Sequence, residues 1–187
     1  MAIKTYTAGS VLTAADMNTY SANSGYVALS KTTMTAVSTA QFTSAFNSTY
    51  RNYRAVFELT GSGASAIYVR LLIGTTVQTG NILSIETRTQ LTPATTSIGT
   101  RSDQYAISGN VFATYSSFYQ IDFCAPQATA YTNWTTTGVS GRSNTDSDQF
   151  YNTARNIVTT SMDGFELTTA GATTFTGTMT LYGVRNV

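Results

Sequence analysis

The sequence predicts an all-β protein, an antiparallel two-sheet β-sandwich with a short N-terminal helical segment. Three observations lead to this prediction. Apolar and polar residues alternate at period two along several segments after residue 25. Glycine-containing turn signals separate these segments at the spacing of a sandwich or barrel. Threonine and tyrosine, which suit a pleated and half-buried surface, are abundant, whereas only 10% of the residues are charged.

The first segment, residues 1–25, differs from the rest of the chain and predicts a short helix. Thr13 is a suitable N-cap, and Asp16 lies where a carboxylate reaches back to the first turn. Leu12 and Met17 match the spacing of a hydrophobic staple. A helix this short is not stable alone in water, so it must dock on another surface. We expect the docking side chains to be Leu12, Thr13, Asp16, Met17 and Tyr20.

The remaining residues, 26–187, predict a single β-sandwich domain. The clearest alternation lies at 53–60, 67–73, 119–125 and 175–181. Weaker strands are expected near 81–89, 104–113, 129–137, 150–160 and 164–169, and turns at 61–63, 108–110, 138–141 and 170–171. About eight to ten strands in one domain favour a jelly roll first and an immunoglobulin-like arrangement second.

An aromatic-rich stretch precedes the first clear strand. Phe42, Phe46, Tyr50 and Tyr53 are three to four residues apart, so a helical turn or a tight loop would bring their rings together. We expect this cluster to close one end of the sandwich.

The residues that commonly carry catalysis are scarce in this chain. There is no histidine, and Cys124 is the single cysteine, which we interpret as a small buried or sheet-lining residue. A catalytic acid pair would require two distant carboxylates, such as Glu58 and Glu86, to meet. The stretch 144–148 alternates oxygen ligands as a calcium loop does, but it lacks the turn glycine and the closing glutamate. We therefore expect a protein without enzymatic activity, cofactor or metal.

Charge and hydropathy also limit the partners that we expect. The ten lysine and arginine residues are scattered singly, which disfavours nucleic-acid binding. No apolar run approaches the roughly 20 residues of a membrane helix. Residues 1–6 lack the charged and apolar regions of a secretory signal, so we expect synthesis in a cytoplasm.

Exposed aromatic residues offer a second hypothesis, that of a carbohydrate-binding module. Tyrosine and tryptophan bind sugars by stacking and hydrogen bonding without catalysis. The candidates for surface recognition are Tyr131, Trp134 and Tyr151, with Tyr115 and Phe118 as further members. A role in filling the core or the sheet is the competing interpretation for each.

Three stretches carry a resemblance to a known group of proteins. They are GSVLTAADMNTY at 9–20, FNSTYRNYRAV at 46–56, and MDGFEL at 162–167 followed by TGTMTLYGVR at 176–185. In this order they resemble the opening segment, the first long strand and the C-terminal hairpin of small virion surface proteins of tailed bacteriophages. The resemblance touches the beginning, middle and end of the chain, whereas residues 76–160 match poorly.

The resemblance implies a non-enzymatic structural component on the virion surface, tail- or fibre-associated and in contact with the host. A capsid decoration (cement) protein or a head fibre is the alternative. The implied partners are other virion proteins through residues 1–25, further copies of the chain in a homotrimer, and a host-surface glycan. Subunit packing would also cover the sheet edges. Synthesis in the bacterial host cytoplasm would precede assembly.

Overall fold

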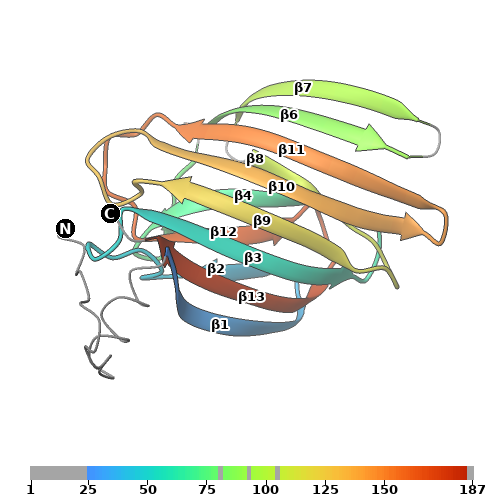
Figure 1. The fold of residues 1–187 in the computed structure, drawn as a ribbon, viewed down its shortest axis with the longest axis horizontal. Coiled ribbons are helices and arrows are strands. Elements are labelled where there is room, and N and C mark those ends of the chain that lie inside the picture. The colour runs from blue at the N-terminus through green and yellow to red at the C-terminus, as the bar shows by residue number, and fades with distance from the viewer. Residues whose placement is uncertain (1–24, 80–81, 92–93, 104–105, 185–187) are drawn as a thin grey trace, which may run out of the picture.

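The computed structural model describes residues 25–79, 82–91, 94–103 and 106–184. They form thirteen strands in two antiparallel sheets (Figure 1), so the predicted all-β, two-sheet architecture is confirmed. The expected N-terminal helix lies outside the described residues. Within the described part of the chain, no helix is long and apolar enough to cross a membrane.

The two sheets differ in size. The large sheet contains, in spatial order, β1 (Tyr26–Val37), β13 (Phe175–Val184), β3 (Asn52–Gly61), β9 (Ser117–Cys124), β10 (Thr132–Ser143), β11 (Asp146–Asn156), β6 (Ile82–Gln90) and β7 (Thr95–Asp103). The small sheet contains β2 (Thr39–Phe42), β12 (Gly164–Thr169), β4 (Ser65–Ile73) and β5 (Thr76–Val77), and β8 (Ala106–Val111) also pairs with β4.

The core lies between the facing sides of the sheets. In β3, Tyr53, Ala55, Phe57 and Leu59 are all buried, as the period-two alternation predicts. The small sheet contributes apolar side chains from β4 and β12, including Phe165 at the centre. Burying a side chain of this size contributes roughly 1.5–3 kcal/mol, so these strands supply a large part of the stability.

The predicted aromatic cluster is confirmed. Phe42, Phe46, Tyr50 and Tyr53 are all buried, and a loop between β2 and β3 brings them together without a helical turn. The Phe46 and Tyr53 ring centroids are 4.8 Å apart, and those of Tyr50 and Tyr53 are 6.0 Å apart.

Two of the predicted turns are wrong, and the ring of Tyr119 explains both. Gly138 and Gly141 lie inside β10, and Gly109 lies inside β8. A Cβ at Gly138 would be 2.2 Å from Tyr119 Cδ1, and one at Gly109 would be 2.1 Å from Tyr119 Cε1. Gly138 and Gly109 therefore make room for a buried ring between the sheets and do not mark the ends of strands.

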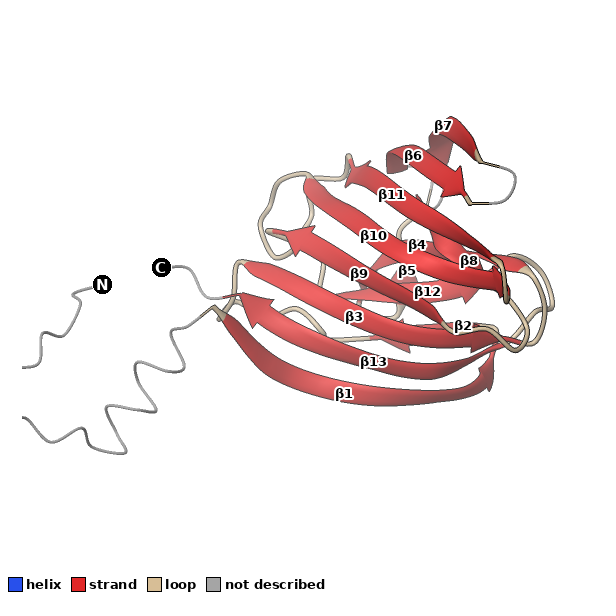
Figure 2. Ribbon diagram, turned by 45° about the vertical axis from the view of Figure 1, so that its right-hand side comes forward, coloured by secondary structure: helices blue, strands red, loops and turns tan. Residues whose placement is uncertain are grey.

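The strand β7 was not among the expected elements. Its sequence, TTSIGTRSD, contains a single large apolar residue, Ile98, and hence no readable alternation. It forms because it pairs with β6 in a continuous register from Ile82–Asp103 to Gln90–Thr95. Figure 2 shows β7 as the outermost strand of the large sheet, next to β6.

Candidate functional site

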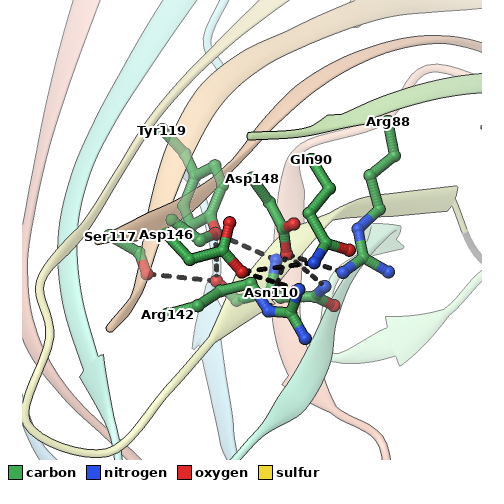
Figure 3. A network of polar contacts seen from close by, with 9 residues as sticks. Arg88, Gln90, Asn110, Ser117, Tyr119, Arg142, Asp146 and Asp148 are labelled. Atoms are coloured by element: carbon green, nitrogen blue, oxygen red, sulfur yellow. Dashed lines mark hydrogen bonds and ion pairs between the residues drawn. The ribbon is translucent and has the colours of Figure 1, made fainter. Parts of the chain in front are cut away.

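Two features of the sandwich gather polar or aromatic side chains: a buried network between the sheets and a groove on the outer face of the large sheet. The network, shown in Figure 3, centres on Asp148 of β11. Asp148 faces inward and is fully buried, and Arg88 Nη2 donates a hydrogen bond to its Oδ2 at 2.8 Å. Beside it, Asp146 Oδ2 accepts from Arg142 Nη1 at 3.0 Å and from Gln90 Nε2 at 3.2 Å.

The same network joins the small sheet to the large one (Figure 3). The backbone N–H of Asn110 in β8 donates to the Tyr119 hydroxyl at 2.9 Å. Ser117 Oγ donates to the carbonyl oxygen of Asn110 at 3.1 Å. Burial raises the pKa of Tyr119 to about 12, so its hydroxyl stays protonated and keeps a proton to donate. We interpret the network as a structural tie between β8 and the large sheet.

The carboxylates considered at the sequence level for a metal site or a catalytic pair have other surroundings in the structure. Asp146 and Asp148, from the calcium-like stretch, contact arginine side chains. Across the described ranges, no group of three or more histidine, cysteine, aspartate or glutamate residues is arranged to hold a metal ion.

Glu58 is exposed on the outer face of β3, whereas Glu86 shares the inner face of β6 with buried Ser84. Three strands separate these two glutamates, so they do not form a catalytic pair.

The groove crosses the outer face of the large sheet over β9, β10, β11 and β6. Its apolar members are Phe118, Val139 and Tyr151, which are 54%, 47% and 53% exposed. They project outward because their neighbours in each strand, such as Tyr119 and Phe150, project into the core. Phe118 pairs directly with Val139, so the ring and the isopropyl group are adjacent on the sheet.

The rest of the groove is lined by uncharged polar side chains. Hydroxyl and amide groups surround the apolar members. The groove has a volume of about 480 Å³, and its lining contains no lysine, arginine, aspartate or glutamate. The polar members are Thr87, Thr89, Gln120, Thr137 and Gln149. A surface of this composition suits a neutral, hydroxyl-rich ligand that stacks on a ring and exchanges hydrogen bonds with amides.

The predicted recognition residues do not lie together. Tyr151 lies in the groove. Tyr131 is exposed next to Arg155, whose guanidinium carbon is 5.8 Å from its ring centroid, and it does not line the groove. Trp134 is only 1% exposed, because it lies on the face of β10 that points into the core, together with Thr132 and Thr136. The predicted surface role of Trp134 is therefore wrong. Cys124 is exposed on the outer face.

Val139, Gln120 and Gln149 were missed at the sequence level. The signal that would have identified Gln120 is present, since it alternates with the core residues Tyr119 and Ile121. Val139 gave no such signal, because the surrounding glycines suggested a turn.

The docking residues expected at the N-terminus, Leu12, Thr13, Asp16, Met17 and Tyr20, lie outside the described residues. Comparison of the chain with protein-family models, with curated proteins and with solved structures finds no match.

Proposed function

We propose that the chain is a non-enzymatic structural component of a tailed-phage virion, exposed on the particle surface and attached through residues 1–25. The virion is suggested by the sequence resemblance, and the observation that supports the anchor is the point at which the described chain begins in the sandwich. Tyr26 at the start of β1 pairs with Val184 at the end of β13, so the segment leaves from one end of a strand at the sheet edge. Among the described residues, the core is built from strands and loops that follow Tyr26. This arrangement suits a terminal anchor and a separately folded outward domain.

The strand order supports a jelly roll as the finer description of the sandwich. Successive strands cross between sheets: β1 lies in the large sheet, β2 in the small, β3 in the large and β4 in the small. The return path through β8, β9, β12 and β13 crosses in the same way. The resulting halves, β1-β13-β3-β9 and β2-β12-β4-β8, contain eight strands, the number of a jelly roll. In this description, β6, β7, β10 and β11 extend the large sheet.

A deletion of residues 1–25 tests the anchor. We expect the truncated protein to unfold at nearly the same urea concentration as the full chain, while losing its association with particles purified from the source that encodes it. Gold-labelled antibodies to the sandwich domain would locate the full chain on those particles, at the tail or on the capsid. An unfolded truncated protein, or particles without label, would contradict the proposal.

The groove favours a second function, the binding of a neutral glycan, either on a host surface or by a free carbohydrate-binding module. Affinity electrophoresis in gels that contain neutral polysaccharides measures this binding on the isolated protein. We expect Phe118→Ala and Tyr151→Ala each to weaken it about two- to tenfold, because stacking on one ring contributes roughly 0.5–1.5 kcal/mol. Tyr131→Ala is the matched control, since it removes an exposed ring outside the groove. Equal loss in all three variants would contradict a groove-specific site.

A further inference from the structure

The two strands at the far end of the large sheet reverse the distribution of apolar and polar side chains. In β3 and β9 the apolar residues face the core. In β6 and β7 the outer face carries Leu83, Ile85 and Ile98, which are 45%, 56% and 73% exposed. The inner face of β6 begins with the buried Ile82 and Ser84 but continues with Glu86, Arg88 and Gln90. These apolar side chains are therefore exposed in the isolated subunit, and Ile98 lies on the edge strand itself.

The backbone edge beside this apolar face is also open. β7 is the last strand of the large sheet, and its nine residues pair with β6 without a register shift. A regular edge strand presents a row of unpaired N–H and C=O groups to any second strand. Residues 95–100 contain no charged side chain and no proline to block such pairing.

The other described edges are protected, which makes β7 the exception among them. β1, at the opposite edge, carries register shifts at Ala28/Ser30 and Met34/Val37, and Lys31 lies between them. In the small sheet, β2 and β5 have only four and two residues, and the β4–β8 pair has a register shift at Ile67/Tyr68. Bulges, lysines and short strands are the usual protection against edge-to-edge pairing.

We infer that β7 pairs with β7 of a second copy of this chain, in an antiparallel and twofold-symmetric manner, and that this contact joins the two large sheets into one and sets Ile98 of one copy beside Ile98 of the other. The occupant must supply an open and regular strand edge, and β7 of a second copy supplies one whose residues 95–100 are uncharged. The outer faces of the two copies form one face only if outward-facing residues pair with outward-facing residues. A register that places Ile98 opposite Ile98 meets this condition and pairs two apolar side chains. The flanking pairs, Gly99 with Ser97 and Thr100 with Thr96, oppose no like charges.

The twofold arrangement differs from the homotrimer that the phage resemblance implies. In a cyclic trimer, β7 would have to meet a different edge of the next copy, and among the described strands the other edge of the large sheet is the bulged strand β1. The twofold contact leaves the groove open. It places two grooves on one face of a continuous sheet, with their β10 strands seven strand spacings apart, or about 34 Å. A repetitive ligand would then be held by both grooves at once.

The oligomeric mass of the full chain gives the first test. Sedimentation equilibrium should show a dimer, twice 20.0 kDa, at micromolar concentration. We expect Ile98→Lys to weaken the dimer about tenfold or more, because the apolar pair is lost and two like charges face each other. Val139→Lys is the matched control, since it places the same charge on the same outer face away from the edge. A monomeric wild-type protein, a trimer, or an equal effect of both variants would overturn the inference.

A disulfide trap tests the register without relying on affinity. In a Cys124→Ser background, Ile98→Cys should form an intermolecular disulfide under mild oxidation, because opposed residues have Cα atoms about 4.5–5.5 Å apart. Val139→Cys in the same background should stay monomeric in a non-reducing gel. Equal cross-linking of both variants would refute the register, whatever the outcome of the particle-labelling experiment.

Discussion

Phe165 offers the sharpest test of how the sandwich is held together. Its side chain is fully buried at the centre of the small sheet. Its ring centroid lies 4.7 Å from that of Phe42, 4.9 Å from Phe123, 5.7 Å from Phe46 and 6.3 Å from Phe57. The ring therefore joins both sheets and the loop that follows β2, and Phe165→Ala would remove all of these contacts together.

The expected cost lies at the upper end of the range for such changes. Truncating a buried phenylalanine to alanine costs about 3–5 kcal/mol, which includes the cavity that remains. Aromatic pairs contribute about 0.5–1.5 kcal/mol beyond the buried area, and Phe165 takes part in several. We therefore expect Phe165→Ala to lower the free energy of unfolding by about 4–5 kcal/mol. Phe165→Leu, which keeps most of the volume, should cost about 1–1.5 kcal/mol and should fold even if the alanine variant does not.

Urea unfolding followed by tryptophan fluorescence measures both changes. Trp134 is the single tryptophan and is buried 6.5 Å from the ring centroid of Phe123, so its emission reports on the core. Phe118→Ala is the matched control, because it makes the same truncation on the outer face and should cost less than about 1 kcal/mol. Equal destabilisation by Phe165→Ala and Phe118→Ala would refute the assignment of the two faces of the sheets.

Three further predictions concern the region around Tyr119. Because burial raises its pKa to about 12, against 10.0 for an unperturbed tyrosine, the unfolded chain loses this proton first as pH rises. The free energy of unfolding should therefore fall by roughly 2–3 kcal/mol between about pH 10 and 12, and urea titrations should show a smaller fall for Tyr119→Phe. Asp148→Ala should cost about 1.5–3 kcal/mol in the same assay, because it removes the charged hydrogen bond between the buried carboxylate and the partly exposed Arg88, whereas Asp122→Ala on the outer face should cost about 1 kcal/mol or less. Gly138→Ala should lower the melting temperature measured by circular dichroism, by about 4 °C or more, because its Cβ would overlap the Tyr119 ring.

Much of the sandwich could be predicted because alternation reports directly on burial. In β3 and β9 one face is uniformly apolar, so the pattern identified both the strand and its inward side chains. The aromatic cluster ahead of β3 could also be predicted, since residues close in the chain reach one another in any compact loop. Of the groove, only Tyr151 and Phe118 were identified. The sequence could not place even these two on the surface, because an exposed aromatic residue has the same appearance in the sequence as a buried one.

The remaining errors arise where contacts between distant strands decide the outcome. Gly138 and Gly109 were interpreted as turn residues, yet each leaves space for a ring from another strand. Trp134 was a candidate for the surface, with a core role as the competing interpretation, because the parity of its strand relative to the core was unknown. A single sequence does not contain the register that settles these positions.

In strand β6 the alternation of apolar and polar residues does not indicate which face points inward. Its pattern places Leu83 and Ile85 on one face and Ser84, Glu86 and Arg88 on the other. On hydrophobicity alone the first face would be the inner one. The register with β11 reverses this, because Ile85 pairs with the outward-facing Thr153. On the inner face of β6, Arg88 donates a hydrogen bond to the buried Asp148 of β11, so a polar network takes the place of apolar packing there. Because that ion pair joins residues 60 positions apart, the alternation within β6 cannot reveal it, and the apolar pattern alone indicates the wrong face.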